Sequence, residues 1–543
     1  MLLLLLYFLL LCVVFAVFGS LANRLLKVSE HLHPVYVLVS GMFFYSLFVW
    51  IILFFTGFNL WWQISTFAIA ILIFLWDKKT QKPVREFVAH IKSWQKKYRL
   101  LWIVFLLFVL FQSTAISSLP DNFSYYIQTI KWANEFGFVP GLMNLHPFLG
   151  QFSAWHILQS GINFGFFNDI NGFLLLLILF FSFDKLHDLE KNNAINWLVF
   201  LPLSSLLFLP FLDSPSPDLA IILLSQLVFY LFISNYRHPE KNTIVILAII
   251  TFFSILIKLT ALPNLILLLV IIFKYKRYFD FRFRQIFVLF FVSIFFLFAK
   301  NYILTGYAFY PFSLGNTVLQ PDWQYPLSIM QYLSELGNRE AFSLHFNQYV
   351  FSDFIKWILQ PGWHKLINIS FVFMLIFFPF FLKNKSNRKA FFFIYLLGLS
   401  YFLAILFYAP NFRFFLQFYV FLFLVLISII LKRKYLNFAL IAGTAFFVLL
   451  FLGLFKTTNI SLLQFVIPQD VSSIKHIDYF KDKIENLDYY RFLDDKDYFW
   501  ETGDAPLPSV QKNQIDYFKY NFHFIPQLRS HNLRSGFYAK KTN

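Results

Sequence analysis

Long apolar runs, separated by short charged or turn-forming segments, recur along almost the whole chain. Most runs approach the roughly 20 residues that an α-helix needs to cross a bilayer. They predict about 14 spans, give or take about two, at residues 1–22, 35–56, 58–76, 100–118, 168–183, 196–211, 219–234, 243–257, 261–273, 286–303, 369–382, 390–408, 414–431 and 436–455. The pattern therefore predicts an all-α polytopic membrane protein.

Composition supports this class, since 59% of the residues are hydrophobic and mean hydropathy is positive. The single cysteine, Cys12, excludes an internal disulfide and a thiolate metal cluster. Residues 1–22 have no basic residue before them and only a weak resemblance to a cleavage site, so we expect a retained span rather than a signal peptide.

The basic residues are distributed very unevenly between alternate loops. With the N-terminus outside, 26 Lys and Arg fall in the inner loops at residues 23–34, 77–99, 184–195, 235–242, 274–285, 382–390 and 431–435, against seven in the outer loops and their rims. Because basic residues accumulate in short cytoplasmic loops, residues 119–167 should lie outside the cytoplasm. The net charge of +17 then belongs mostly to inner loops, and we expect contact with a lipid bilayer and not with nucleic acid.

Three stretches depart from the alternation of span and short loop. Residues 119–167 predict two short helices at the membrane surface, and residues 304–368 predict a second outer loop. The charged, Tyr-rich tail predicts a small soluble region or an ordered cap over the outer face. This divides the chain into N-terminal extra membrane helices with a basic loop (1–99), a membrane core (100–455) and a C-terminal periplasmic region (456–543).

Ionisable residues at the outer rims of spans are the candidates for chemistry, because a charge in a membrane is costly without a partner or a cavity. Lys258 interrupts the run from 243 to 273 and should mark a break between two short helices. With Lys300 and Arg413 it could bind a phosphate, although each residue taken alone is better explained as an anchor at the membrane rim.

Other polar residues carry weaker signals. Asp213 and Asp218 bracket Ser-Pro-Ser-Pro, where helix capping is the favoured role of Asp218. Asp322 and Trp323 could bind a sugar or form a turn. His146 and His156 lie too far apart, without supporting ligands, to indicate zinc. No GxSxG, Walker or Rossmann motif is present, so nucleotide hydrolysis and hydride transfer lack support.

Asp121 opens the outer loop that follows an early span, in the run DNFSYYIQTIKWANEFGFVPGLMNLHPFLGQFSAW. A carboxylate there could serve as a general base or as the N-cap of the first surface helix. This run, together with SPSPDLA, IKLTALP, KNYILTGYAFYP, DW and APNFRF, resembles an uncharacterised bacterial branch of the GT-C superfamily of membrane glycosyltransferases. The resemblance is scattered along residues 100–540.

The resemblance implies a GT-C-like fold in a bacterial inner membrane, with the active face in the periplasm. It implies transfer of a sugar from a polyprenyl-phosphate donor to an envelope glycan, lipid or protein acceptor, with Asp121 as the base. Lys258, Lys300 and Arg413 would bind the donor phosphate, and we expect Tyr125, His146, Asp322 and Trp323 to bind sugar or acceptor. Asn122 stands where many members carry a second acid, and Tyr126 where this branch has histidine, so a divalent metal cofactor is not favoured.

Two alternatives stay open from the sequence. A polymerase or ligase of lipid-linked glycan repeats also combines many spans with a large outer loop and cationic residues. A transporter or flippase of envelope precursors would need charged residues near the middle of spans and often an internal repeat; the ionisable residues here lie at rims and we find no repeat.

Overall fold

Helices form most of the protein, and the strands described lie in the C-terminal region. A computed structural model describes residues 1–28, 31–115, 117, 119–165, 170–192, 197–276, 280–313, 320–342, 351–382, 387–406, 411–431, 435, 440–445, 479–492 and 500–542. The predicted helical class is confirmed for this part of the chain.

The described residues contain seven helices that are long and apolar enough to cross a membrane. They are α1 (Leu2–Leu25), α2 (Pro34–Leu53), α10 (Pro217–Asn235), α13 (Asp280–Thr305), α16 (Trp363–Phe381), α17 (Arg388–Leu406) and α18 (Phe412–Ile430). Their number makes the chain a multi-pass membrane protein by length and composition.

Further helices are shorter or more polar. They are α3 (Leu60–Trp76), α4 (Lys78–Ser93), α5 (Lys96–Gln112), α8 (Asn171–Asn192), α11 (Lys241–Ile257) and α12 (Pro263–Lys274). Helices α3 and α4 meet at a bend of 86°. Helix α4 is charged and amphipathic, so we treat it as a surface helix and not as a span.

The 14 predicted spans are only partly matched. Residues 197–211 are not one regular helix but three short pieces, η4 (Trp197–Phe200), α9 (Leu201–Ser204) and η5 (Ser205–Phe211). Pro202 lies in the first turn of α9 and Pro210 inside η5, and each prevents a continuous α-helix because proline lacks a backbone donor and clashes with the preceding turn. Most of the predicted span at 436–455 lies outside the described residues.

The break predicted at Lys258 is present. Helix α11 ends at Ile257, Lys258 is extended with φ −158° and ψ 136°, and the short turn η6 (Leu259–Ala261) leads into α12. One apolar run thus becomes two helices, and the side chain of Lys258 leaves the backbone at the gap between them.

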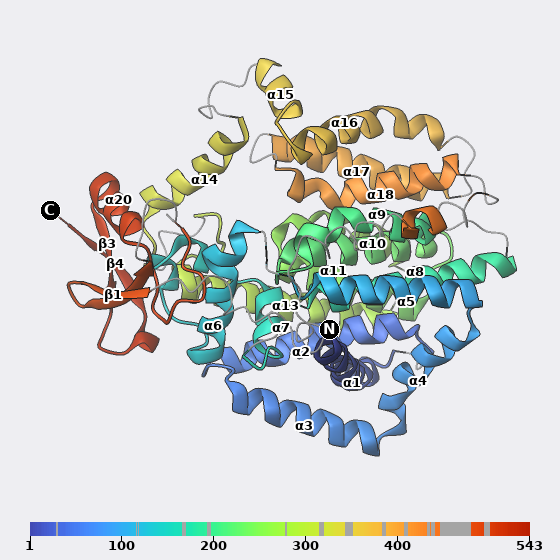
Figure 1. Ribbon diagram of the computed structural model, residues 1–543, viewed down its shortest axis with the longest axis horizontal. Coiled ribbons are helices and arrows are strands. Elements are labelled where there is room, and N and C mark those ends of the chain that lie inside the picture. Colours follow the sequence, from blue (N-terminus) through green and yellow to red (C-terminus); the bar gives the residue numbers. More distant parts are fainter. Residues whose placement is uncertain are drawn as a thin grey trace.

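The helices pack as layers, with α16, α17 and α18 lying beside one another above α10 and α11, while α3 and α4 border the opposite side (Figure 1). Large apolar side chains remain exposed along α3, α13 and α16, among them Trp76, Phe295 and Phe380. An exposed apolar surface of this kind in a multi-pass protein is suited to contact with lipid.

One end of the bundle carries the outer loop and the C-terminal region (Figure 1). The loop contains the π-helical turn η1 (Asn122–Tyr126), then α6 (Ile127–Glu135), η2 (Leu142–Asn144), η3 (Pro147–Gln151) and α7 (Ala154–Ser160). Helices α6 and α7 confirm the two short helices predicted for this loop. Helices α14 (Leu327–Phe342) and α15 (Phe351–Ile358) belong to the second predicted outer loop.

The C-terminal region contains two antiparallel strand pairs. Strand β1 (Tyr479–Ile484) pairs with β2 (Leu487–Phe492), with Tyr479 opposite Phe492, and β3 (Phe524–Leu528) pairs with β4 (Phe537–Lys541), with Phe524 opposite Lys541. Helix α20 (Lys512–Phe522) and the turn η10 (Leu533–Ser535) complete it.

Helices α1 and α2 approach so closely that glycine is required at their contact. A Cβ atom on Gly41 would overlap the backbone of Phe15, and one on Gly19 would overlap the carbonyl of Val37. Small residues at helix contacts allow this approach in membrane proteins, where packing drives association.

We expect Gly41→Leu to lower the free energy of unfolding by about 1–3 kcal/mol, because the new side chain has no space against Phe15. Ala68→Leu, at an exposed position of α3, is the matched control and should change little. Thermal unfolding of the purified protein in detergent measures both. Equal unfolding midpoints for the two variants would contradict the close contact.

Candidate functional site

Asp121 lies directly before η1, and its side chain makes no capping hydrogen bond to this turn. Its backbone is helical, with φ −58° and ψ −28°, so the N-cap role that the sequence left open is not the one it has here. Its carboxylate instead accepts from Arg413 Nη1 at 2.6 Å and from the Tyr126 hydroxyl at 3.3 Å. Both bonds from described residues end on Oδ2, which leaves Oδ1 for a ligand.

Arg413, at the start of α18, connects two carboxylates. Its Nη1 atom lies 2.6 Å from Asp121 Oδ2 and 3.7 Å from Asp218 Oδ2. Asn411 caps α18 by accepting from the Arg413 backbone N–H, so the cap and the charged group lie in the same turn. Residues 121, 218 and 413 are distant in sequence but meet at one point.

Asp218 is the most buried member, with only 3% of its side chain exposed. It pairs with Lys258 Nζ and lies in the first turn of α10, where the helix dipole favours a negative charge. The N-cap of α10 is Ser216, whose hydroxyl accepts from Asp218 N. The favoured sequence interpretation, that Asp218 caps this helix, was wrong, and the carboxylate is instead a partner of two cations.

These four residues, Asp121, Asp218, Lys258 and Arg413, form what we call the outer charge cluster. Its two carboxylates and two cations balance. Lys258 also lies over the ring of Phe414, 5.0 Å from the centroid. The carboxylates already have cationic partners, so the cluster offers little net negative charge to a divalent metal.

A cavity of about 240 Å³ adjoins Lys258 and is also lined by Lys300, Tyr125 and His156. Lys300 is buried and donates to the carbonyl of Phe152 at 2.9 Å. The amines of Lys258 and Lys300 thus lie in the wall of the same cavity.

His156 in the cavity wall and Tyr126 beside it are both neutral. Burial lowers the pKa of His156 to about 3 and raises the pKa of Tyr126 far above its usual value. Tyr126 therefore keeps the proton that it donates to Asp121, and its ring lies 4.8 Å from that of His156. Tyr125 donates to Gln151 Oε1 at 3.4 Å and faces the same cavity.

The other predicted binding residues lie elsewhere. His146 is buried, its Nδ1 accepts from Phe148 N, and its Nε2 lies 2.9 Å from the Trp500 carbonyl. Burial lowers its pKa to about 4, so it is neutral and donates to that carbonyl. Its nitrogens are thus engaged with the protein.

Asp322 and Trp323 both contact Arg529 of the C-terminal region. Arg529 forms two bonds to the Asp322 carboxylate, at 2.7 and 3.0 Å, and lies 4.7 Å from the Trp323 ring centroid. Sugar binding at these residues stays a prediction, and neither residue lines the cavity beside Lys258.

The C-terminal region holds the segment that carries Asp121. The backbone N–H groups of Thr502 and Gly503 donate to the Phe123 carbonyl at 3.0 and 2.7 Å. Gln128 donates to the carbonyls of Gly503 and Ala505, and Lys131 pairs with Asp504 at 3.0 Å. These contacts fasten η1 and α6 from the side opposite the helical core.

Asp218 and Tyr126 are the site residues that the sequence analysis missed. An acid at the outer rim of a buried apolar helix was the available signal for Asp218, but the capping pattern around it explained it equally well. The hydrogen bond from Tyr126 to Asp121 had no signal in the sequence other than the closeness of the two residues along the chain.

We expect Asp218→Ala to lower the free energy of unfolding by about 3–5 kcal/mol, because it leaves Lys258 without its buried partner. The double variant with Lys258→Met should recover part of this loss. Asp188→Ala, which removes the exposed partner of Lys185, should cost less than about 1 kcal/mol. Unfolding in detergent measures the free energy for each variant. If Asp218→Ala lowers the free energy of unfolding no more than Asp188→Ala does, the pair of Asp218 and Lys258 is not important for stability.

Comparison with known proteins gives a family but no activity. Residues 1–421 match a protein family described as a domain of unknown function, DUF8201. No curated protein and no solved structure matches the chain. The matched segment contains the whole outer charge cluster and covers well over half of the 543 residues. The chain therefore belongs to the DUF8201 family.

Proposed function

We propose that this protein is a membrane glycosyltransferase that moves a sugar from a polyprenyl-phosphate donor to an envelope acceptor at the outer face of a bacterial inner membrane. The observation that carries the proposal is the meeting of Asp121 with Lys258 and Arg413 beside a cavity. The GT-C resemblance implies proton transfer for Asp121 and phosphate binding for Lys258 and Arg413. The GT-C resemblance supplies the reaction class.

The cavity suits the head of a lipid-linked donor. It lies where α11 breaks and beside Leu297, Lys300 and Asn301 of α13. These are ends of apolar helices, so a lipid tail can remain in the bilayer while its phosphate reaches Lys258 and Lys300. Its volume of about 240 Å³ is slightly below the range of about 300–1,000 Å³ typical of ligand pockets, and accommodates one small polar group.

The chemistry needs a base and a stabilised leaving group. A neutral hydroxyl of the acceptor loses its proton to Asp121 Oδ1 as its oxygen bonds to the anomeric carbon of the donor sugar. The bond from that carbon to the phosphate oxygen breaks, and the phosphate leaves with the electron pair. Lys258 and Lys300 stabilise its charge without a protonation step.

Donor binding can also control the base. Arg413 is shared between Asp121 and Asp218, and Nη1 is closer to Asp121. A phosphate that draws the guanidinium away from Asp121 would leave this carboxylate able to accept a proton. The base would then become available when the donor is in place, which limits wasteful transfer to water.

We expect Asp121→Asn to abolish transfer while the protein still folds, because the amide keeps the shape but cannot take the proton. Mass spectrometry of envelope glycans and polyprenyl-linked intermediates should show one sugar missing, with the lipid-phosphate sugar accumulating, in both a deletion strain and the Asp121→Asn strain. The control variant Asp488→Asn, at an exposed position of strand β2, should restore the missing sugar fully in the deletion strain.

Other outcomes of this experiment separate the alternatives. Loss of joined repeat blocks, with single repeats retained, would indicate a polymerase or ligase. Full rescue by Asp121→Asn at normal expression would remove the catalytic assignment and favour a transporter of envelope precursors.

The proposed orientation places the outer loop and C-terminal region in the periplasm. In a Cys12→Ala background, a cysteine introduced as Ser530→Cys should react with a membrane-impermeant maleimide in intact spheroplasts. Lys79→Cys, on the exposed surface of α4, should react only after permeabilisation. The reverse pattern would place the outer charge cluster on the cytoplasmic face and exclude an envelope acceptor there.

A further inference from the structure

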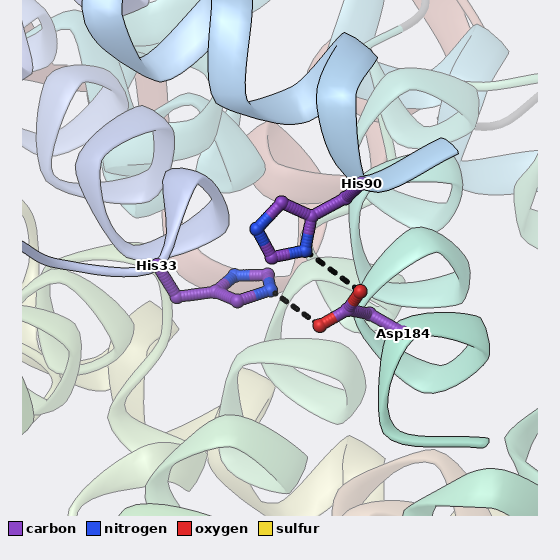
Figure 2. Close-up of side chains that lie close together, drawn as sticks. All are labelled: His33, His90 and Asp184. Carbon is purple, nitrogen blue, oxygen red and sulfur yellow. Dashed lines mark hydrogen bonds and ion pairs between the residues drawn. The ribbon is translucent and has the colours of Figure 1, made fainter. Parts of the chain in front are cut away.

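A second group of ionisable side chains lies among helices from both the N-terminal segment and the core. His33 precedes α2, His90 lies in the last turn of α4, and Asp184 belongs to α8. Figure 2 shows the two imidazole rings beside each other, each facing one oxygen of the Asp184 carboxylate. These residues lie in three of the segments that the charge distribution assigns to the cytoplasmic side, away from the outer charge cluster.

The spacing of the donor atoms fits a metal ion. His33 Nε2 lies 3.3 Å from Asp184 Oδ2, and His90 Nδ1 lies 2.7 Å from Asp184 Oδ1. One ligand atom from each residue can be chosen so that all three lie within 4.8 Å of one another. Zinc bound tetrahedrally at about 2.0–2.2 Å places neighbouring ligand atoms roughly 3.3 Å apart, so a pair of ligand atoms at the 4.8 Å limit would close by about 1.5 Å on binding.

The surroundings hold these groups in position. Trp94 Nε1 donates to Asp184 Oδ1 at 3.2 Å. The His33 and Phe181 rings pack in a T-shaped contact, with their centroids 4.8 Å apart. Such outer contacts orient metal ligands in proteins. The Asp184 side chain is 6% exposed, whereas that of His90 is 35% exposed, so one side of the group is open to an ion.

Hydrogen bonds from the two imidazole rings to Asp184 also account for these contacts. Metal binding must therefore change the positions of the ring protons. His33 Nδ1 accepts from Val35 N at 3.3 Å, so the proton of the neutral ring lies on Nε2, facing Asp184. A metal at Nε2 requires the ring proton to move to Nδ1, and the long bond to Val35 N is lost. In His90 the proton moves likewise from Nδ1 to Nε2.

We infer that His33, His90 and Asp184 form a binding site for a divalent transition metal of the zinc class. Two imidazoles and one carboxylate suit Zn²⁺ better than Mg²⁺ or Ca²⁺, which prefer oxygen ligands. Water supplies the fourth ligand. The ion connects the start of α2 and the end of the surface helix α4 to α8, and so stabilises the N-terminal helices against the core. The inference does not rest on the proposed glycosyltransferase activity.

The test uses the full-length protein, purified in detergent and stripped with a chelator. Titration with Zn²⁺ should load about one equivalent per chain, measured by elemental analysis, and raise the temperature of unfolding. Asp184→Asn, His90→Gln and His33→Asn should each weaken binding by at least the 10–100-fold that follows loss of an outer-shell partner. Asparagine at 33 retains the ability to cap α2.

His238→Gln removes an exposed histidine from another loop of the same side and is the matched control. Zinc that is lost equally in this control would be an adventitious ion only, and the inference would fail. No stoichiometric binding, or binding retained by all three ligand variants, would also overturn it and leave a hydrogen-bonded cluster.

A second measurement removes dependence on the folding of the variants. Co²⁺ added to the unaltered protein should give the intense visible absorption of four-coordinate cobalt, and X-ray absorption of the zinc form should show two imidazole ligands. An octahedral site with only oxygen ligands would overturn the inference.

Discussion

The buried carboxylate of Asp218 is the constraint on which the outer end of the bundle depends. A carboxylate with 3% of its side chain exposed is costly unless it is paired and hydrogen-bonded. Lys258 reaches it only because α11 stops one residue earlier, and Arg413 reaches it because α18 begins there. Two features that resemble ordinary helix ends are thus fixed by one buried charge, and Arg413 extends the same network to Asp121.

Local features of the sequence predicted much of the fold but little of this network. Apolar runs located most of the long helices, and a lysine within such a run predicted the break at 258, because both signals are local. The pattern Ser-Pro-Ser-Pro-Asp correctly indicated the start of α10, but it could not separate the capping Ser216 from the paired Asp218. Residues 196–211 are as apolar as a span, yet two prolines prevent residues 197–211 from forming one continuous α-helix. That Asp121, Asp218, Lys258 and Arg413 meet depends on packing between helices, which one sequence does not encode locally.

The sequence left open whether the C-terminal region forms an ordered cap, and the contacts show that it holds the segment that carries Asp121. Thr502 and Gly503 form backbone bonds to Phe123, two residues after Asp121, and Gln128 fixes the next turn. The π-helical turn η1 is therefore held on one side by the core and on the other by this region. Such turns occur often at functional sites, where a wider helix redirects a side chain. The family match ends at residue 421, so the position of Asp121 depends partly on residues beyond the matched segment.

The N-terminal helices also support the cavity, although the resemblance places them outside the usual core. Tyr7 and Tyr45 donate to the carbonyls of Ile162 and Gly161, which end the α7 segment that carries His156. The centroid of the Trp50 ring lies 6.0 Å from Lys300 Nζ. A displacement of α1 and α2 would therefore move both a wall residue and a cation of the proposed donor site. Contacts that hold these helices against α8 at the other end of α2 therefore also support the geometry of the proposed donor site.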